Sequence, residues 1–445
     1  MRLKTSYGQI FSISMPIMLG SAAQNLIVLC DSIFLFHYSS LDFEASGIVG
    51  VFYLMIAAIG YGFSRGGQIL IARRNGEQNY EGTGAAFQAL FLFEAILALL
   101  LFYVLYWQSE FIFSLFVKDR EILTKCLEYI KPRGYGVFFS YLGVSLIAFY
   151  TGIARTKFII YDTIVLIAVN VILNWIFIFG KFGFPSMGIA GAALASTWAE
   201  IVAFIVFVLY MIRDRHNHVY QLLKFKHFDY HLVISSFLLS IPIVFQSILG
   251  IGSWFLFFSF IENVGREELA ISNLLRNVYL ILSIPSWGYA AGINTLVSNF
   301  IGNKKRQAVI PLVLKTAKLN VFTTIILSMP VLVFPEFFLY PFFGADESGL
   351  LLKSKPYMGT LFAILLAFAV GVVFVNGLIG TGKTKQALWI QSLFTFLYIT
   401  YIFIFIKFNY SGLHLAWGVE VLYWAGIFLM SYLYLKSNRW HFLKI

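Results

Sequence analysis

The chain has 445 residues, of which 60% are hydrophobic and only 12% are charged, and its formal net charge is +11. Soluble proteins carry roughly 25% charged residues, so this composition excludes a soluble globular domain and indicates a membrane protein. Each spanning helix needs about 20 apolar residues, and about twelve such spans would leave room only for short loops.

The apolar runs predict twelve spanning helices. In chain order they lie near 10–36, 46–72, 84–108, 132–152, 160–180, 188–212, 232–261, 270–300, 312–334, 356–380, 386–408 and 412–435. Glycine, proline or charged residues punctuate nearly every gap between these runs. The predicted fold class is therefore an all-α membrane protein with twelve transmembrane helices.

Lysine and arginine are concentrated in the gaps on the side of the N-terminus. This asymmetry predicts a multi-pass protein of the cell inner (plasma) membrane with both termini cytoplasmic. We interpret the net positive charge as this topology signal, so the lipid bilayer is an expected partner and nucleic acid is not. The first apolar run is too long for a cleavable signal peptide.

The second half of the chain repeats the first. SMPI at Ser14–Ile17 returns as SIPI at Ser240–Ile243, and Gly66 returns as Gly292, each 226 residues later. A six-helix half keeps the orientation of its copy, so the halves should be related by a pseudo-two-fold axis along the membrane normal. Paired lobes of this kind usually enclose a substrate path, which indicates transport.

The repeat also predicts how the chain divides into lobes. We expect an N-lobe at 1–215, a cytoplasmic linker at 216–231 and a C-lobe at 232–445. Aromatic residues make up 18% of the chain, which suits a tolerant apolar cavity with cation–π capacity.

A charge at mid-bilayer costs about 2.5–3.5 kcal/mol, so the few charged residues inside the predicted spans are functional candidates. Asp31 lies in the outer half of the first span, on the same predicted helix as Pro16. The matching position of the second half is Phe257, so that lobe lacks this carboxylate. We interpret Asp31 as a proton or Na+ site; the alternative is an acid that reaches the headgroups or pairs with arginine.

Glu94, Glu200, Arg65 and Arg276 are candidates for a proton relay or a substrate cavity, and Glu420 is a further acid in the last span. Glu200 either relays protons or pairs with Arg65, and we favour pairing because a lone buried charge is costly. If Arg65 faces the cavity, an anionic or zwitterionic substrate follows; if it pairs with Glu94 or Glu200, it is structural. Arg276 lies near enough to the outer end of its span to reach the headgroups.

The span at 160–180 contains NVILN, which places Asn170 and Asn174 on one helical face. Two carboxamides in hydrocarbon need partners, because each unsatisfied polar group costs several kcal/mol. Asn174 falls at the depth of Asp31, and Ser196 of the next span could add another oxygen to a hard-cation shell. The sequence predicts a cation-coupling site of these four residues, with Na+ at Asp31, Asn170 and Asn174; a plain helix–helix hydrogen bond is the alternative.

Taken in order, these features resemble the multidrug and toxic compound extrusion (MATE) transporters of the MOP flippase superfamily. The resemblance covers nearly the whole chain. Besides the two six-helix halves, it rests on Pro16 with Asp31, GQILIARRNGEQN at Gly67–Asn79, its echo NTLVSNFIGNKK at Asn294–Lys305, NVILN, and GAALAS at Gly191–Ser196.

The resemblance implies an antiporter that exports amphipathic, often cationic small molecules in exchange for Na+ or protons, without a cofactor and as a monomer. It places the coupling site on Asp31 and on the polar residues of the fifth and sixth helices. Pro16 would let the first helix bend, because proline removes a backbone hydrogen bond. Some family members carry a second-lobe site, but the nearest positions here are Gly250 and Phe368, so none is expected.

Two other classes compete with this reading. A flippase for a lipid-linked saccharide or another anionic lipid precursor would use Arg65 and Arg276 to hold phosphates. An enzyme would need a clustered nucleophile or metal constellation, and none is evident, so an enzyme is not expected. GLIGTGKT at Gly377–Thr384 matches the phosphate-binding P-loop pattern, but it follows a membrane helix instead of a strand, so we do not expect ATP binding.

Overall fold

The computed structural model describes residues 3, 5–222, 230–335, 337, 348–407 and 412–441. The first half of the chain forms α1 (Tyr7–Phe36), α2 (Ser40–Gly76), α3 (Tyr80–Tyr103), α4 (Ser109–Ser114), α5 (Arg120–Gly152), α6 (Lys157–Phe179) and α7 (Gly188–Arg213). The second half forms α8 (Tyr230–Val264), α9 (Arg266–Leu282), α10 (Ile284–Gly302), α11 (Val309–Val333), α13 (Ser348–Ser354), α14 (Met358–Gly380), α15 (Thr384–Lys407) and α16 (Leu413–Lys436).

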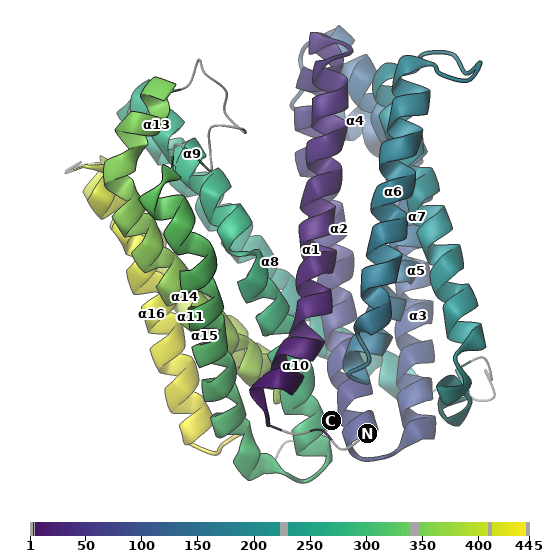
Figure 1. Ribbon diagram of the computed structural model, residues 1–445, viewed down its shortest axis with the longest axis vertical. Coiled ribbons are helices and arrows are strands. Elements are labelled where there is room, and N and C mark those ends of the chain that lie inside the picture. The colour runs from purple at the N-terminus through teal and green to yellow at the C-terminus, as the bar shows by residue number, and fades with distance from the viewer. Residues whose placement is uncertain are drawn as a thin grey trace. The chain divides into compact units, whose positions relative to one another are not determined.

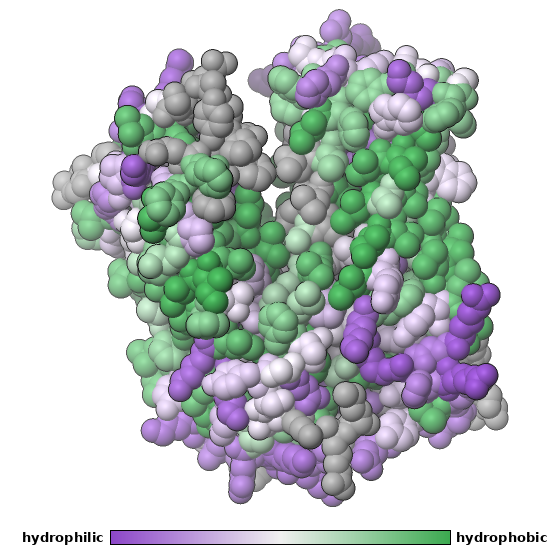
Figure 2. All heavy atoms as spheres, viewed as in Figure 1, coloured by the Kyte–Doolittle hydropathy of each residue, from purple (hydrophilic) through white to green (hydrophobic). Residues whose placement is uncertain are grey.

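Most of these helices are long and apolar enough to cross a membrane. Among the described residues ten helices meet this condition, and the bent pair α9–α10 raises the number to eleven. The remaining long helix, α1, has 30 residues. Figure 2 shows hydrophobic side chains gathered on the outer surface of these helices and hydrophilic ones toward the helix ends. This distribution fits helices whose middle portions contact lipid.

The predicted span at 270–300 is broken into two helices. α9 and α10 meet at an angle of 44°, with Ser283 between them and Pro285 in the first turn of α10. Proline suits that position, because the first N–H groups of a helix have no intrahelical acceptor. α2, the equivalent helix of the first half, contains no proline and runs unbroken from Ser40 to Gly76.

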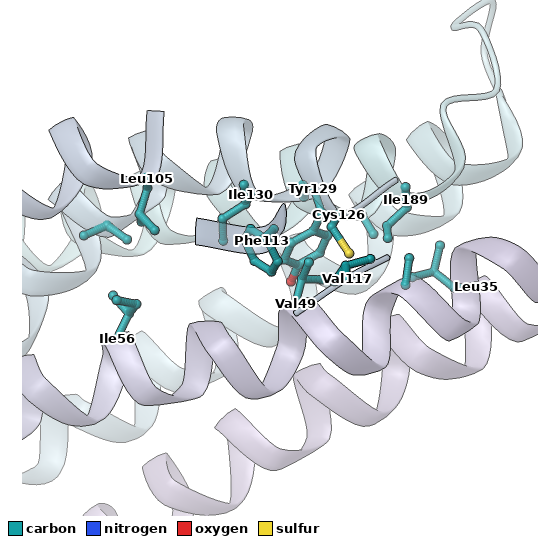
Figure 3. Packing of buried hydrophobic residues seen from close by; sticks show 14 of the residues in the cluster. Leu35, Val49, Ile56, Leu105, Phe113, Val117, Cys126, Tyr129, Ile130 and Ile189 are labelled. Carbon is teal, nitrogen blue, oxygen red and sulfur yellow. The ribbon is translucent and has the colours of Figure 1, made fainter. Parts of the chain in front are cut away.

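The predicted span at 132–152 is too short, because α5 already begins at Arg120. The turns of α5 before residue 132 carry charged side chains, which lower the local hydropathy, so the apolar run begins later than the helix does. Cys126 is therefore part of α5. Figure 3 shows it in the core that α1, α2, α4, α5 and α7 build near Phe113.

The chain divides into two compact units (Figure 1). One comprises Leu19–Ile241, and the other comprises Met1–Met18 together with Pro242–Ile445. α5 is central to the first unit and contacts α2, α3 and α7, whereas α14 is central to the second and contacts α10, α11 and α16. The lobe limits at 1–215 and 232–445 stay a prediction.

Equivalent contacts in the two units reflect the sequence repeat. In the first unit Ser240 Oγ donates to the Phe63 carbonyl at 2.8 Å, and a Cβ atom at Gly66 would lie 2.8 Å from the Ser240 nitrogen. In the second unit, a Cβ atom at Gly292 would clash with the Ser14 side chain. Glycine is required at both places because another helix's backbone or serine occupies the space of a side chain.

Gly66→Ala is expected to lower the thermal stability of the purified protein. The added methyl would meet the backbone of α8, and overpacking of this kind costs about 1–3 kcal/mol. Gly47→Ala is the matched control, because Gly47 lies on the same helix with nothing within 4 Å of its Cβ position. Thermal unfolding in detergent compares the two variants. Equal melting temperatures would show that the contact at Gly66 does not constrain the helices.

Candidate functional site

The buried face of α6 carries the polar residues of the candidate site. Asn170 and Asn174 are fully buried and stand one helical turn apart, so their carboxamides share a face. α6 ends at Phe179, and the next residue, Gly180, has a φ of 67° and terminates the helix in the left-handed conformation. The chain then returns through a short loop into α7.

α7 approaches α6 closely because its first turns consist of small residues. A Cβ atom at Gly191 would lie 2.7 Å from the Phe177 carbonyl of α6, so only glycine fits there. This close approach places Ser196, two turns into α7, beside Asn170. The Asn170 amide donates to Ser196 Oγ at 3.0 Å.

Asp42 positions the beginning of α7. Its buried carboxylate accepts a hydrogen bond of 2.8 Å from the backbone nitrogen of Ile189, and Lys125 Nζ lies 3.4 Å away. A carboxylate at a helix N-terminus satisfies a free N–H group and favours the helix dipole. Asp42 could not be singled out from the sequence, because its partner is far along the chain and it resembles an ordinary acid in the first turn of a helix.

The four predicted coupling residues form one hydrogen-bonded ring. Asn174 donates to Asp31 Oδ1 at 2.5 Å and to Asn170 Oδ1 at 3.2 Å, and Ser196 donates to Asp31 Oδ2 at 3.1 Å. With the bond from Asn170 to Ser196, the ring closes. The structure thus brings together Asp31 from α1, both asparagines from α6 and Ser196 from α7, all within the first unit.

The ring is buried and leaves one acceptor unused. Asp31 is 8% exposed, and within the described part of the chain no arginine or lysine forms a salt bridge with it. Asn174 Oδ1 is buried and has no hydrogen-bond partner among the described residues. A buried carboxylate beside an unused carbonyl oxygen offers an oxygen-rich place for a hard cation, or a donor and acceptor pair for a proton.

Glu200 pairs with Arg133 and not with Arg65, so the favoured pairing was wrong in its partner. Arg133 donates to both Glu200 oxygens, at 2.9 and 3.0 Å, and its guanidinium carbon lies 3.8 Å from the centroid of the Tyr53 ring. The sequence left Arg133 at the boundary of the short predicted span. The true length of α5 places it inside the unit, opposite α7.

The other charged candidates do not join the ring. Glu94 accepts a hydrogen bond of 2.8 Å from Ser64 Oγ, and Arg65 forms no salt bridge within the described ranges. Arg276, in the second unit, lies over the Phe258 ring at 4.9 Å from its centroid. Pro16 is inside α1, and bending there stays a prediction.

Asp162 is a buried acid that the sequence reading missed. It lies on α6 near the beginning of the helix, is 7% exposed, and its Oδ1 atom has no hydrogen-bond partner among the described residues. It belongs to the same buried stripe as Asn170 and Asn174. It lies at the first turn of the predicted span at 160–180, and its burial depends on neighbouring helices such as α1, whose Gly20 lies against Thr163.

Repeated sets of spanning helices with a buried polar cluster are typical of secondary membrane transporters. The family model MatE matches residues 16–176 and 242–411, so the chain belongs to the MatE family. Its relatives include the probable multidrug resistance protein NorM of Thermotoga maritima, 23% identical over 97% of this chain and 92% of that protein, and the probable multidrug resistance protein YoeA of Bacillus subtilis, 23% identical over 79% and 76%.

Solved structures share the fold. One described as the outward-facing conformation of a multidrug resistance MATE family transporter of the MOP superfamily aligns with a TM-score of 0.88 over 97% of this chain and 95% of that one, at 18% identity. A MOP superfamily transporter from Pyrococcus furiosus aligns with a TM-score of 0.87 over the same shares, also at 18% identity. These matches confirm the predicted all-α membrane fold of twelve helices in two six-helix lobes.

Proposed function

We propose that the protein is a secondary antiporter that exports amphipathic, cationic small molecules in exchange for Na+ or protons. The family assignment supports transport, and relatives named as multidrug resistance proteins support drug-like substrates. The observation that carries the proposal is the closed ring around Asp31 with its unused acceptor on Asn174.

The ring can bias a conformational equilibrium because it joins three helices. Asp31 holds α1 through Asn174 of α6 and through Ser196 of α7. When a cation binds to the Asp31 carboxylate, it competes with the hydrogen bonds that Asn174 and Ser196 donate to that carboxylate. The conformational state that binds the cation better then gains population. Export follows if substrate and cation favour opposite states of the same equilibrium. In this scheme Asp31 supplies the negative charge. The amide and hydroxyl groups change their hydrogen bonds when the cation or proton neutralises that charge.

Gradient experiments test the coupling ion. In proteoliposomes that contain the purified protein, we expect a Na+ gradient or a pH gradient to drive transport of a cationic dye, and dissipation of that gradient to stop it. Equal ionic strength on both sides, with K+ replacing Na+, is the control for salt effects. A rate of dye transport that is unchanged by either gradient would contradict the antiporter proposal.

A flippase for a lipid-linked saccharide or another anionic lipid precursor is the second candidate. The observation that favours it is Arg65, which is partly buried and forms no salt bridge within the residues that the structure describes. An anionic headgroup would supply its counter-charge. Arg65→Gln separates the candidates: it should abolish movement of a fluorescent anionic lipid under the flippase proposal and leave cationic dye efflux intact under the antiporter proposal.

A further inference from the structure

Glu420 is a buried carboxylate of the second unit that the proposed function does not use. It lies on α16, about two turns after the helix begins, and is 3% exposed. The indole nitrogen of Trp254, on α8, donates to Glu420 Oε1 at 2.7 Å. Within the described residues no lysine, arginine or histidine pairs with it.

Aromatic side chains from several helices surround this carboxylate. The Trp254 ring lies 5.3 Å from Tyr279 of α9, and Tyr423 of α16 lies 5.6 Å from Tyr398 of α15, measured between ring centroids. The Tyr398 hydroxyl and the Trp424 indole nitrogen also face Glu420. Both are buried and have no hydrogen-bond partner among the described residues.

These surroundings differ in kind from the Asp31 ring. Around Asp31 the neighbours offer carbonyl and hydroxyl oxygens, which are ligands of a hard cation. Around Glu420 two of the three polar neighbours are indole N–H groups, which donate hydrogen bonds and have no lone pair to give to a metal ion. An organic cation would have to displace packed rings to reach a carboxylate that is 3% exposed, whereas a proton needs no space.

Opposing effects act on the charge of this group. Burial among rings disfavours the carboxylate form, and the N–H and O–H donors favour it. A group held between such effects changes its protonation state when a small movement brings a donor closer or removes it. The two unused donors, on Tyr398 and Trp424, are the groups whose approach to Glu420 would do so.

We propose that Glu420 is a proton-exchange site of the second unit, separate from the Asp31 ring. In the acid form a proton from water is bonded to one Glu420 oxygen, while Trp254 keeps its own hydrogen and remains the donor to the carboxyl group. Release returns that proton to water and leaves a carboxylate held by Trp254, Tyr398 and Trp424. A part in the transport cycle rests on the proposed antiport, but the exchange of the proton does not.

The titratable groups that face Glu420 are few. Tyr279 of α9, Tyr398 of α15 and Tyr423 of α16 act on it electrostatically. Arg276 of α9 is nearby in the unit but lies over the Phe258 ring. α14 has no titratable residue between Met358 and Gly380, and the part of α8 beside Trp254 has none. Glu420 is therefore the carboxyl group of this cluster, and the titratable groups that face it are tyrosines, which ordinarily titrate near about pH 10.

Infrared difference spectra of the purified protein in lipid vesicles, recorded between acid and alkaline pH, test the site without transport. We expect a protonated-carboxyl band that Glu420→Gln abolishes and Asp31→Asn leaves in place. Trp254→Phe should keep the band and shift its frequency, because the hydrogen bond that the Trp254 indole donates to Glu420 Oε1 is lost. Trp254→Phe also serves if Glu420→Gln does not fold.

The spectra decide the proposal in either direction. A difference spectrum that is unchanged by Glu420→Gln overturns it, and so does a band that Trp254→Phe does not shift. Antiport is measured separately as dye efflux. If the wild-type protein shows the Glu420 band but no gradient-driven dye transport, the proposed antiport is wrong and the proton-exchange site is still supported.

Discussion

Asp31→Asn should abolish gradient-driven efflux while the protein stays folded. The amide cannot carry the negative charge that a cation or proton must neutralise, so no ion gradient can bias the two transport states. The asparagine oxygen can still accept from Asn174, and its new N–H group faces Ser196 Oγ, whose hydroxyl can rotate to accept. We therefore expect a stability change of about 1 kcal/mol or less, the net worth of one hydrogen bond.

Gradient-driven dye transport in proteoliposomes and thermal unfolding in detergent measure the two expectations. Glu44→Gln is the matched control, because it removes an exposed acid from the beginning of α2 in the same unit. It should leave both efflux and melting temperature unchanged. Efflux that persists in Asp31→Asn at the wild-type rate would remove Asp31 from the coupling mechanism. Loss of folded protein would instead assign it a structural role.

The Asp31 ring shows what could be predicted from this sequence. A charged residue in an apolar run is rare, so Asp31 was found by its chemistry. The spacing of Asn170 and Asn174 fixed a common face, and counting residues along two helices that run the same way matched their depth. Ser196 followed from the small residues before it. Each step used only local periodicity and helix length, which are physical properties that the sequence carries directly.

The ion pair of Glu200 shows what could not be predicted. Arg133 stands among charged residues that interrupt the apolar run, so hydropathy placed it at a membrane boundary. Its partner is 67 positions away on another helix, and no periodicity links the two. Asp42 and Asp162 were missed for the same reason, since their burial depends on which helices lie beside them. Such pairings are set by the assembled bundle and not by any one segment.

Arg133→Met should be strongly destabilising. It leaves the largely buried Glu200 opposite α5 without a counter-charge, and breaking a fully buried ion pair from one side typically costs about 3–5 kcal/mol, which is the upper limit for this pair. The loss also removes the cation–π contact with Tyr53, at 3.8 Å from the ring centroid. Tyr53 is left as the only hydrogen-bond donor to Glu200 in the described contacts, at 3.4 Å. Thermal unfolding and the monodisperse fraction in size-exclusion chromatography measure the effect.

The double variant Arg133→Met with Glu200→Leu should recover most of that stability, because replacing both charges by apolar groups removes the unpaired carboxylate. A double variant as unstable as the single one would mean that shape, and not charge, holds α5 against α7. The double variant also decides between the two interpretations of Glu200. If it folds and still exports dye under the driving gradient, Glu200 is no proton relay, and its carboxylate serves only to hold Arg133 inside the membrane.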